Sequence, residues 1–152
     1  MKKEYLILGL LIVAVGLIWL GTNGGESIGE LASPRASETT SNPASVNEDG
    51  IAQVALDDLP VNVQESFKKY DEDGWSGRVE GQTEGTKAGG TFHNYDENLP
   101  THDEQGNALS YREFDVNNKK PNSNRDAERF IKGSDGRVYF TSDHYATFVQ
   151  II

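Results

Sequence analysis

Four side chains near the C-terminus are of the types that can cleave a phosphodiester bond without a metal ion. They are Glu113, Arg125, Arg129 and His144. A carboxylate can accept a proton as a general base, and a protonated imidazole can donate one as a general acid. Two guanidiniums can hold phosphoryl oxygens while negative charge builds on them. The set therefore predicts phosphoryl-transfer chemistry, provided that the fold brings the four side chains together.

Each of these residues alone has a simpler interpretation. Glu113 alone is typical of a solvated strand residue, and each arginine is typical of a surface ion pair. His144, in "YFTSDHYATF", is then a polar residue of an ordinary turn. Only the combination of one carboxylate, one imidazole and two guanidiniums favours catalysis.

The strand predicted around Glu113 determines where its carboxylate points. In "SYREFDV" the period-two alternation puts Tyr111, Glu113 and Asp115 on one face and Phe114 and Val116 on the other. The two apolar side chains favour the core. We therefore expect Glu113 to point out of the open face of a sheet, as a catalytic carboxylate must.

A tight turn is expected to bring the histidine close to the arginines. The segment "SDG", residues 134–136, is a strong turn signal between two strand patterns. If the turn has two residues, position 129 pairs opposite position 142, so that Arg129 lies within two residues of His144 in register. A longer turn would shift this register by a residue or two without separating the two residues far.

Helices are predicted only at the start of the domain. Val63, Phe67 and Tyr70 stand at helical spacing and predict a helix over residues 60–70, which Gly74 closes. Residues 51–56, "IAQVAL", predict a shorter helix before it.

Strands are predicted for the second half of the domain. The glycine-rich residues 74–100 have no helical period and predict loops and irregular hairpins. Four strand patterns follow, in "ALSYREFDVN", "RFIKG", "RVYFT" and "YATFVQII". The expected fold class is α+β, with an N-terminal helix or helices packed on a twisted antiparallel β-sheet and the other face free for a ligand.

The composition excludes several classes of function. The 152 residues include no cysteine, so disulfides, thiolate metal sites and a cysteine nucleophile are excluded. A formal net charge of −10 excludes binding of a polyanion by bulk charge, so any nucleic-acid contact must come from a few placed cations. The acid-rich "DEDG" and "DEQGN" lack the spacing of a calcium loop, and "GQTEGTK" lacks that of a phosphate loop.

The N-terminal residues predict export. Residues 1–20 open with Lys2 and Lys3 and continue as an uncharged apolar run over residues 5–20. This is the layout of a signal peptide, but the run could also serve as an N-terminal membrane anchor. Residues 21–50 have the composition of a flexible linker or spacer. The folded domain is expected over residues 51–152 and outside the cell.

Residues 55–152 resemble the barnase-like secreted microbial guanyl-specific ribonucleases, most strongly from residue 89 onward. "YREFDVN" resembles the strand with the family's catalytic glutamate, at Glu113, and "RDAER" its pair of phosphate-binding arginines. "DHYATF" resembles the segment with the catalytic histidine and the tyrosine after it, His144 and Tyr145. "GGTFHNYDENLP" resembles the loop that recognises guanine, and the residues in its positions are Phe92, His93, Asn94, Tyr95 and Asp96.

The resemblance implies an activity and partners. It implies cleavage of single-stranded RNA on the 3′ side of guanosine, with Glu113 as general base, His144 as general acid and no metal or other cofactor. The first product would be a 2′,3′-cyclic phosphate, which water opens, and DNA would resist. A barstar-like intracellular inhibitor and a monomeric enzyme are also implied. The chain departs from the family at Tyr95 and Asp96, where arginine and glutamate are usual, and has no clear match for a helix lysine found in some relatives.

Two other classes of function were weighed against this one. A binding module on the same fold, with weakened catalysis, would fit the altered Tyr95 and Asp96, although binding alone does not require the pair Glu113 and His144. A calcium-stabilised or cell-surface adhesion domain would fit the acidity and a membrane anchor. It leaves the arginines and the histidine unexplained.

Overall fold

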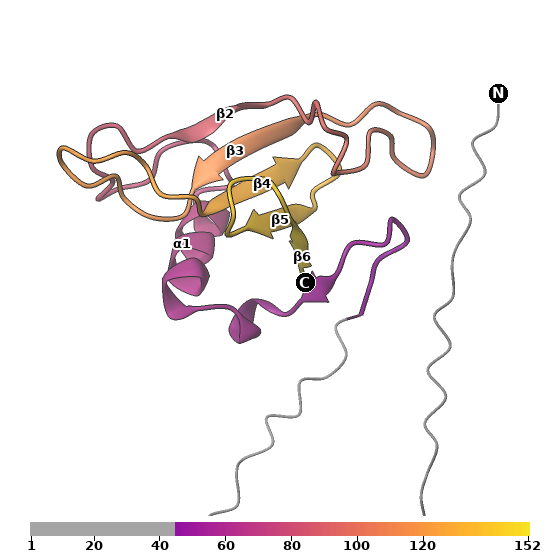
Figure 1. The fold of residues 1–152 in the computed structure, drawn as a ribbon, viewed down its shortest axis with the longest axis horizontal. Coiled ribbons are helices and arrows are strands. Elements are labelled where there is room, and N and C mark those ends of the chain that lie inside the picture. Colours follow the sequence, from indigo (N-terminus) through magenta and orange to yellow (C-terminus); the bar gives the residue numbers. More distant parts are fainter. Residues whose placement is uncertain (1–44) are drawn as a thin grey trace, which may run out of the picture. The chain divides into compact units, whose positions relative to one another are not determined.

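The computed structural model describes residues 45–152, which form one helix and six strands (Figure 1). The elements are β1 (Gln53–Val54), a 3-10 helix (Leu56–Asp58), α1 (Val61–Glu72), β2 (Ala88–Phe92), β3 (Tyr111–Asp115), β4 (Arg129–Gly133), β5 (Val138–Thr141) and β6 (Val149–Ile151). The predicted signal peptide or anchor and residues 21–44 of the predicted linker lie outside the described residues. Within residues 45–152, no helix has the length and apolarity that crossing a membrane requires.

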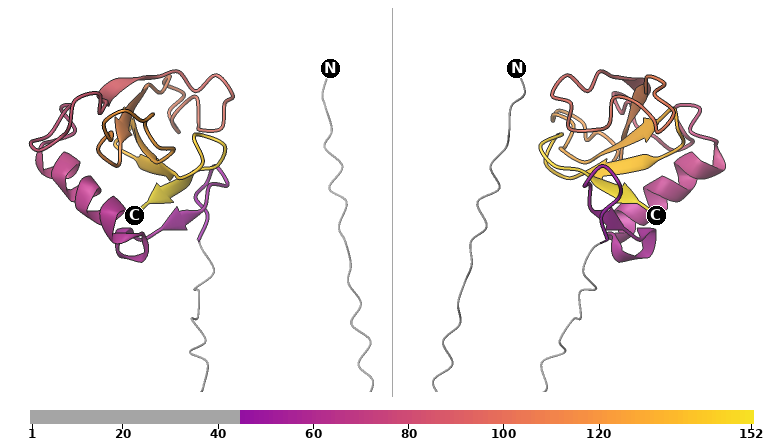
Figure 2. Two further views of the ribbon diagram at one scale, coloured as in Figure 1. Left: turned by 60° about the vertical axis from the view of Figure 1, so that its left-hand side comes forward. Right: turned by 90° about the vertical axis from the view of Figure 1, so that its right-hand side faces the viewer.

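The six strands form one sheet in the order β1-β6-β5-β4-β3-β2, and α1 packs on one of its faces (Figure 2). The α+β prediction is thereby confirmed. β1 is the exception to the expected antiparallel arrangement, because it pairs in parallel with β6. The short helix predicted over residues 51–56 is wrong, since the main chain there is hydrogen-bonded to Gln150 and Ile152 as a strand, and only the 3-10 turn after it is helical.

The predicted helix over residues 60–70 is confirmed as α1, with Pro60 directly before it. Val63, Phe67 and Tyr70 face the sheet, as their spacing requires. The helix ends where Trp75 donates its backbone N–H to the carbonyl of Tyr70 at 2.8 Å, with Gly74 in the left-handed region at φ 66°. The Trp75 ring then packs into the core, with its centroid 5.1 Å from that of Phe114.

Strand β2 lies inside the glycine-rich segment that predicted only loops and irregular hairpins. Its pairing with β3 is interrupted by a bulge between Ala88 and Gly90. Gly89 has φ 89° there, and a Cβ atom on it would lie 2.3 Å from Nη2 of Arg112. The guanidinium of Arg112 crosses the bulge and donates hydrogen bonds to the carbonyls of Gly89, Trp75 and Ser76. Through these bonds, Arg112 connects the edge strand β2 to the segment that follows α1.

The sheet face opposite α1 is partly covered, although the sequence predicted it to be free. A second, smaller core there consists of Leu99, Tyr111, Ile131 and Tyr139. The end of β2 and the loop that follows β5 supply part of its outer layer, with Phe92 and Phe148 respectively. The part of this face next to Glu113 remains open.

Residues 45–50, which the sequence placed in the linker, are hydrogen-bonded to the domain. Asn47 donates its side-chain amide to Oε1 of Gln150 at 2.7 Å. The guanidinium of Arg137, beside the β4–β5 turn, forms ion pairs with Glu48 and with Asp49, the latter at 2.9 Å. The observed fold therefore starts before residue 51.

Candidate active site

Glu113 lies in the middle of β3, on the face opposite α1, where the alternation predicted it. It is half-buried, and its Oε2 atom accepts a hydrogen bond from the hydroxyl of Tyr145, 32 residues later in the chain. Burial, reinforced by this carboxylate, raises the pKa of Tyr145 to about 12. Tyr145 therefore stays protonated at neutral pH and acts as a fixed donor to Glu113.

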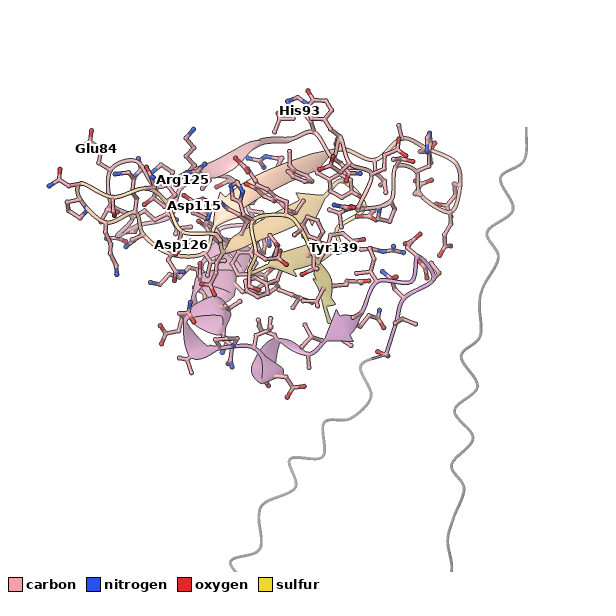
Figure 3. The ribbon with its side chains drawn as sticks, in the orientation of Figure 1. Glu84, His93, Asp115, Arg125, Asp126 and Tyr139 are labelled. Atoms are coloured by element: carbon pink, nitrogen blue, oxygen red, sulfur yellow. The ribbon has the colours of Figure 1, made fainter. Side chains whose placement is uncertain are left out.

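Asp115 forms ion pairs with both predicted phosphate-binding arginines, and Figure 3 shows it close to Arg125. Its Oδ1 atom lies 2.7 Å from Nη1 of Arg125 and 3.0 Å from Nε of Arg129, and its Oδ2 accepts the backbone N–H of Lys87 at 2.8 Å. Asp115 and Arg129 are each only 1% exposed, whereas Arg125 is partly open to solvent. One buried carboxylate thus fixes both guanidiniums.

Sequence reasoning did not select Asp115 as a functional residue. One signal was nevertheless present, because Asp115 shares the face of Glu113 in the alternation predicted for this strand. The structure adds the second half, since the register of the sheet places Asp115 directly opposite Arg129 on β4. A carboxylate at such a position needs a cation, because burying an unpaired charge costs several kcal/mol, on the order of 3 to 5.

Arg129 is further restrained by its own segment and lies beside the tyrosine. Its Nη1 atom donates to the carbonyl of Glu128 at 2.7 Å and lies 3.2 Å from Oδ1 of Asp126. Its positive charge opposes the rise of the pKa of Tyr145. The charge of Arg129 therefore acts on the same hydroxyl that Tyr145 donates to Glu113.

His144 lies in the turn between β5 and β6 and is exposed. Its ring is tilted against that of Tyr145, with centroids 4.6 Å apart. Both residues have positive φ, 58° and 74°, so the turn is sharp. Asp143 braces it by accepting hydrogen bonds from the N–H and hydroxyl of Thr147 and from the hydroxyl of Thr141. These bonds, first those from Thr147, lower the pKa of Asp143 to about 2.

The register between the arginine and the histidine differs by one residue from the simplest prediction. Arg129 pairs with Thr141 and not with position 142, because the turn between β4 and β5 is longer than two residues. The backbone N–H of His144 nevertheless bonds to the carbonyl of Ala127 at 3.3 Å. The structure thus brings Glu113, Arg129 and His144 to one side of the sheet.

The recognition loop, residues 92–96, is held by Asn94. The side-chain amide of Asn94 donates to the carbonyl of Leu99 at 2.8 Å and accepts the N–H of Leu99 at 3.1 Å. The ring of Phe92 packs against that of Tyr145, with centroids 5.1 Å apart. The rings of His93 and Tyr95 stack on each other outside the loop.

A cleft of about 240 Å³ joins this loop to the carboxylate of Glu113. We call it the catalytic cleft. Besides the recognition loop, its lining includes Thr91, Asn98, Glu113 and Tyr145. All six residues predicted to bind substrate line it, whereas Arg125, Arg129 and His144 are not among its lining residues. Among residues 45–152 there is no group of three or more histidine or acidic side chains arranged to hold a metal ion.

Comparison with solved structures finds similarity to crystal structures of ribonuclease Sa2. The structure with guanosine-2′-cyclophosphate is 26% identical, with a TM-score of 0.49, over 67% of this chain and 96% of that one. A structure with exo-2′,3′-cyclophosphorothioate is 28% identical, with a TM-score of 0.48, over 67% of this chain and 97% of that one.

Comparison with curated proteins found no match. A family model described as ribonuclease matches residues 41–152, which is well over half of the chain and includes every residue of the cleft. Since that match covers all of residues 45–152, the protein belongs to the ribonuclease family.

Proposed function

We propose that this ribonuclease is a guanyl-preferring endoribonuclease that cleaves single-stranded RNA on the 3′ side of guanosine without a metal ion. Glu113 is the general base and His144 the general acid. The observation that carries the proposal is the contact of one tyrosine with both groups: Tyr145 donates to Glu113 and packs against the ring of His144. A carboxylate that lines the cleft and an imidazole outside its lining therefore contact the same tyrosine.

The first step forms a cyclic product. Glu113 removes the proton from the ribose 2′-hydroxyl as its oxygen attacks phosphorus. The bond from phosphorus to the 5′-oxygen of the next nucleotide breaks, and protonated His144 supplies the proton that this oxygen needs. The products are a 2′,3′-cyclic phosphate and a free 5′-hydroxyl.

The second step hydrolyses the cyclic phosphate. Neutral His144 removes a proton from water as the water oxygen attacks phosphorus. The bond to the 2′-oxygen breaks, and the proton held by Glu113 passes to that oxygen. The product is a 3′-phosphate, and both groups return to their starting states.

Arg125 and Arg129 stabilise the charge that builds on the phosphoryl oxygens in both steps. Their guanidiniums are already held by Asp115, so little reorganisation is needed when the phosphate arrives. Arg125 keeps part of its side chain exposed and can bind a phosphate directly. Buried Arg129 contributes its charge beside Tyr145.

Guanine is proposed to bind in the catalytic cleft, between the recognition loop and Tyr145. Asp96, which lines the cleft with Glu113, would accept hydrogen bonds from the Watson–Crick edge of guanine. The ring of Phe92 packs against that of Tyr145, and both rings line the catalytic cleft. Asn94 fixes the conformation of the loop by bonding to both backbone polar atoms of Leu99.

The wider biology is proposed from the sequence. Residues 1–20 would direct export and residues 21–44 would link them to the ribonuclease domain, so the enzyme would act outside the cell as a monomer. A barstar-like inhibitor would protect the producing cell by covering the catalytic cleft. Sequencing the N-terminus of the mature protein distinguishes a cleaved signal peptide from a retained anchor.

Cleavage of the dinucleotide GpU tests the proposal. We expect turnover that a chelator leaves unchanged, a bell-shaped pH profile, and no cleavage of the 2′-deoxyguanosine analogue. Glu113→Gln and His144→Ala should each lose activity by at least about 100-fold, a typical contribution of general acid or base catalysis. Circular dichroism and melting of both variants control for folding. Folded variants that cleave at the wild-type rate would refute the assignment, and RNA binding without turnover in the wild type would favour a binding module.

A further inference from the structure

The aromatic pair on the recognition loop has the form of a stacking platform. His93 and Tyr95 have ring centroids 5.0 Å apart and ring planes only 13° from parallel. Tyr95 is 84% exposed, the most exposed of the large hydrophobic side chains in residues 45–152. His93 projects outward beyond the end of β2 (Figure 3). A ring held this way contributes little to the core, but one of its faces can stack on a nucleobase.

The recognition loop also lines a second hollow, separate from the catalytic cleft. This outer pocket has a volume of about 430 Å³. It shares residues 91–95 with the catalytic cleft, but its other lining residues are Glu97, Thr101, Leu109, Ser110 and Tyr111, and neither Glu113 nor Tyr145 reaches it. The platform of His93 and Tyr95 therefore stands between two hollows.

The direction of the RNA chain decides which nucleotide could reach the outer pocket. With guanine in the catalytic cleft, the scissile phosphate lies at Glu113, and the departing nucleotide lies on the side of His144. The part of the substrate that extends away from both groups is the nucleotide joined to the 5′ side of guanosine. We propose that His93, Tyr95 and the outer pocket form a subsite for the nucleobase immediately 5′ to guanosine. This inference rests on the proposed function.

The charges of the outer pocket favour a base over a phosphate. No lysine or arginine is among its lining residues, and Glu97 would repel a phosphate. The hydroxyls of Thr101 and Ser110 and the carboxylate of Glu97 can form hydrogen bonds with the edge of a base. The subsite should thus bind through ring stacking, with a mild preference among bases and little dependence on salt.

The test compares GpU with ApGpU, which adds a 5′ nucleotide, and with GpUpA, which adds a 3′ nucleotide. In the wild type, KM for cleavage after guanosine in ApGpU should be at least about five-fold lower than for GpU, as one stacked base provides. Tyr95→Leu, which keeps apolar bulk but removes the flat ring, should abolish this ratio. Tyr95→Phe should keep it, and His93→Ala should reduce it by removing the supporting ring.

The KM ratios of the three substrates distinguish a failure of this inference from a failure of the proposed function. The KM ratio of GpUpA to GpU should be the same in the wild type and in Tyr95→Leu, because the 3′ nucleotide lies on the side of His144. Equal KM values for ApGpU and GpU in an active wild type would overturn the subsite, and so would a ratio that survives Tyr95→Leu. Absence of GpU cleavage would instead overturn the proposed function, which the subsite requires.

Discussion

The hydroxyl of Tyr145 donates a hydrogen bond to the carboxylate of Glu113, although 32 residues separate them. The bond fixes the orientation of the carboxylate within the catalytic cleft. It also ties the turn that carries His144 to the centre of the sheet. Removal of this hydroxyl should therefore change the orientation of the proposed general base and leave the packing of the core unchanged.

Tyr145→Phe should lower kcat for GpU by about ten-fold, because a hydrogen bond to a charged group contributes roughly 1.5 to 3 kcal/mol. Steady-state kinetics at neutral pH measures it. Tyr139→Phe is the matched control: this buried hydroxyl has no hydrogen-bond partner, although Arg137 lies nearby and opposes the rise that burial causes in its pKa. A Tyr145→Phe enzyme as fast as the Tyr139→Phe enzyme would contradict the role of the hydroxyl.

Asp115→Asn should reduce the free energy of unfolding by about 3 to 5 kcal/mol, since it removes the buried charge partner of Arg129 and leaves only the exposed Asp126. Urea unfolding measures this. Asp126→Asn removes a negative charge from the same arginine at an exposed position and should cost less than about 1 kcal/mol. Equal losses of unfolding free energy in the two variants would show that burial of the Asp115–Arg129 ion pair does not determine its contribution to stability.

Asp96→Glu should increase the preference for GpU over ApU, because the longer side chain brings its carboxylate closer to the guanine edge in the cleft. A gain of about ten-fold corresponds to one better hydrogen bond to a charged group. The ratio of kcat/KM for the two dinucleotides measures it. Glu84→Gln, before the opposite end of β2, is the control and should leave the ratio unchanged. Asp96→Asn should lower the ratio; if neither substitution moves it, Asp96 does not contact the base.

Stability should fall above pH 10 because of Tyr70. Burial raises the pKa of Tyr70 from its ordinary value of 10.0 to about 12, and its hydroxyl donates to the carbonyl of Asp115 at 2.7 Å. Between these two pH values the unfolded chain loses the proton and the folded chain keeps it, so the free energy of unfolding decreases as pH rises, on the order of 2 kcal/mol in total. Denaturant unfolding from pH 9 to 12 measures the slope, which Tyr70→Phe should reduce. An unchanged slope in that variant would assign it to other groups.

Asp143→Ala should lower kcat by about ten-fold through the turn that carries His144, because it removes three hydrogen bonds that brace that turn. The low pKa of Asp143 means that this bracing is complete above pH 4 and is lost only as pH falls towards 2. Ser142→Ala, at the exposed neighbouring position, controls for simple truncation. If KM for GpU rises while kcat is unchanged, Asp143 acts on binding and not on the position of His144.

The sequence predicted the regular parts of the domain because their patterns are local. Alternation along β3 was sufficient to separate the face of Glu113 from that of Phe114, and helical spacing was sufficient to find α1. β1 was missed because two residues carry no period and their pairing with β6 depends on main-chain atoms about a hundred residues away.

The parts of the candidate site that escaped prediction depend on tertiary contacts. In the sequence, Asp115 has the pattern of a solvated acidic residue, and only the pairing of β3 with β4 places Arg129 opposite it. The positive φ of His144 and Tyr145 could not be inferred either, because it belongs to a turn that Asp143 braces through hydrogen bonds from Thr141 and Thr147. The grouping of residue types could be predicted, whereas the bonds that hold the groups in place could not.

The side-chain amide of Asn94 bonds to the backbone of Leu99 and closes a small ring of main chain, inside which Glu97 donates its backbone N–H to the carbonyl of Asn94. Under the proposed function, substitutions at residues 95–97 should change the base preference more than the rate of cleavage, since Asp115 and Tyr145 hold the proposed reacting groups from other parts of the fold. Base preference and rate would then be separable, and an enzyme of this design could acquire a new sequence preference in single steps while remaining active throughout.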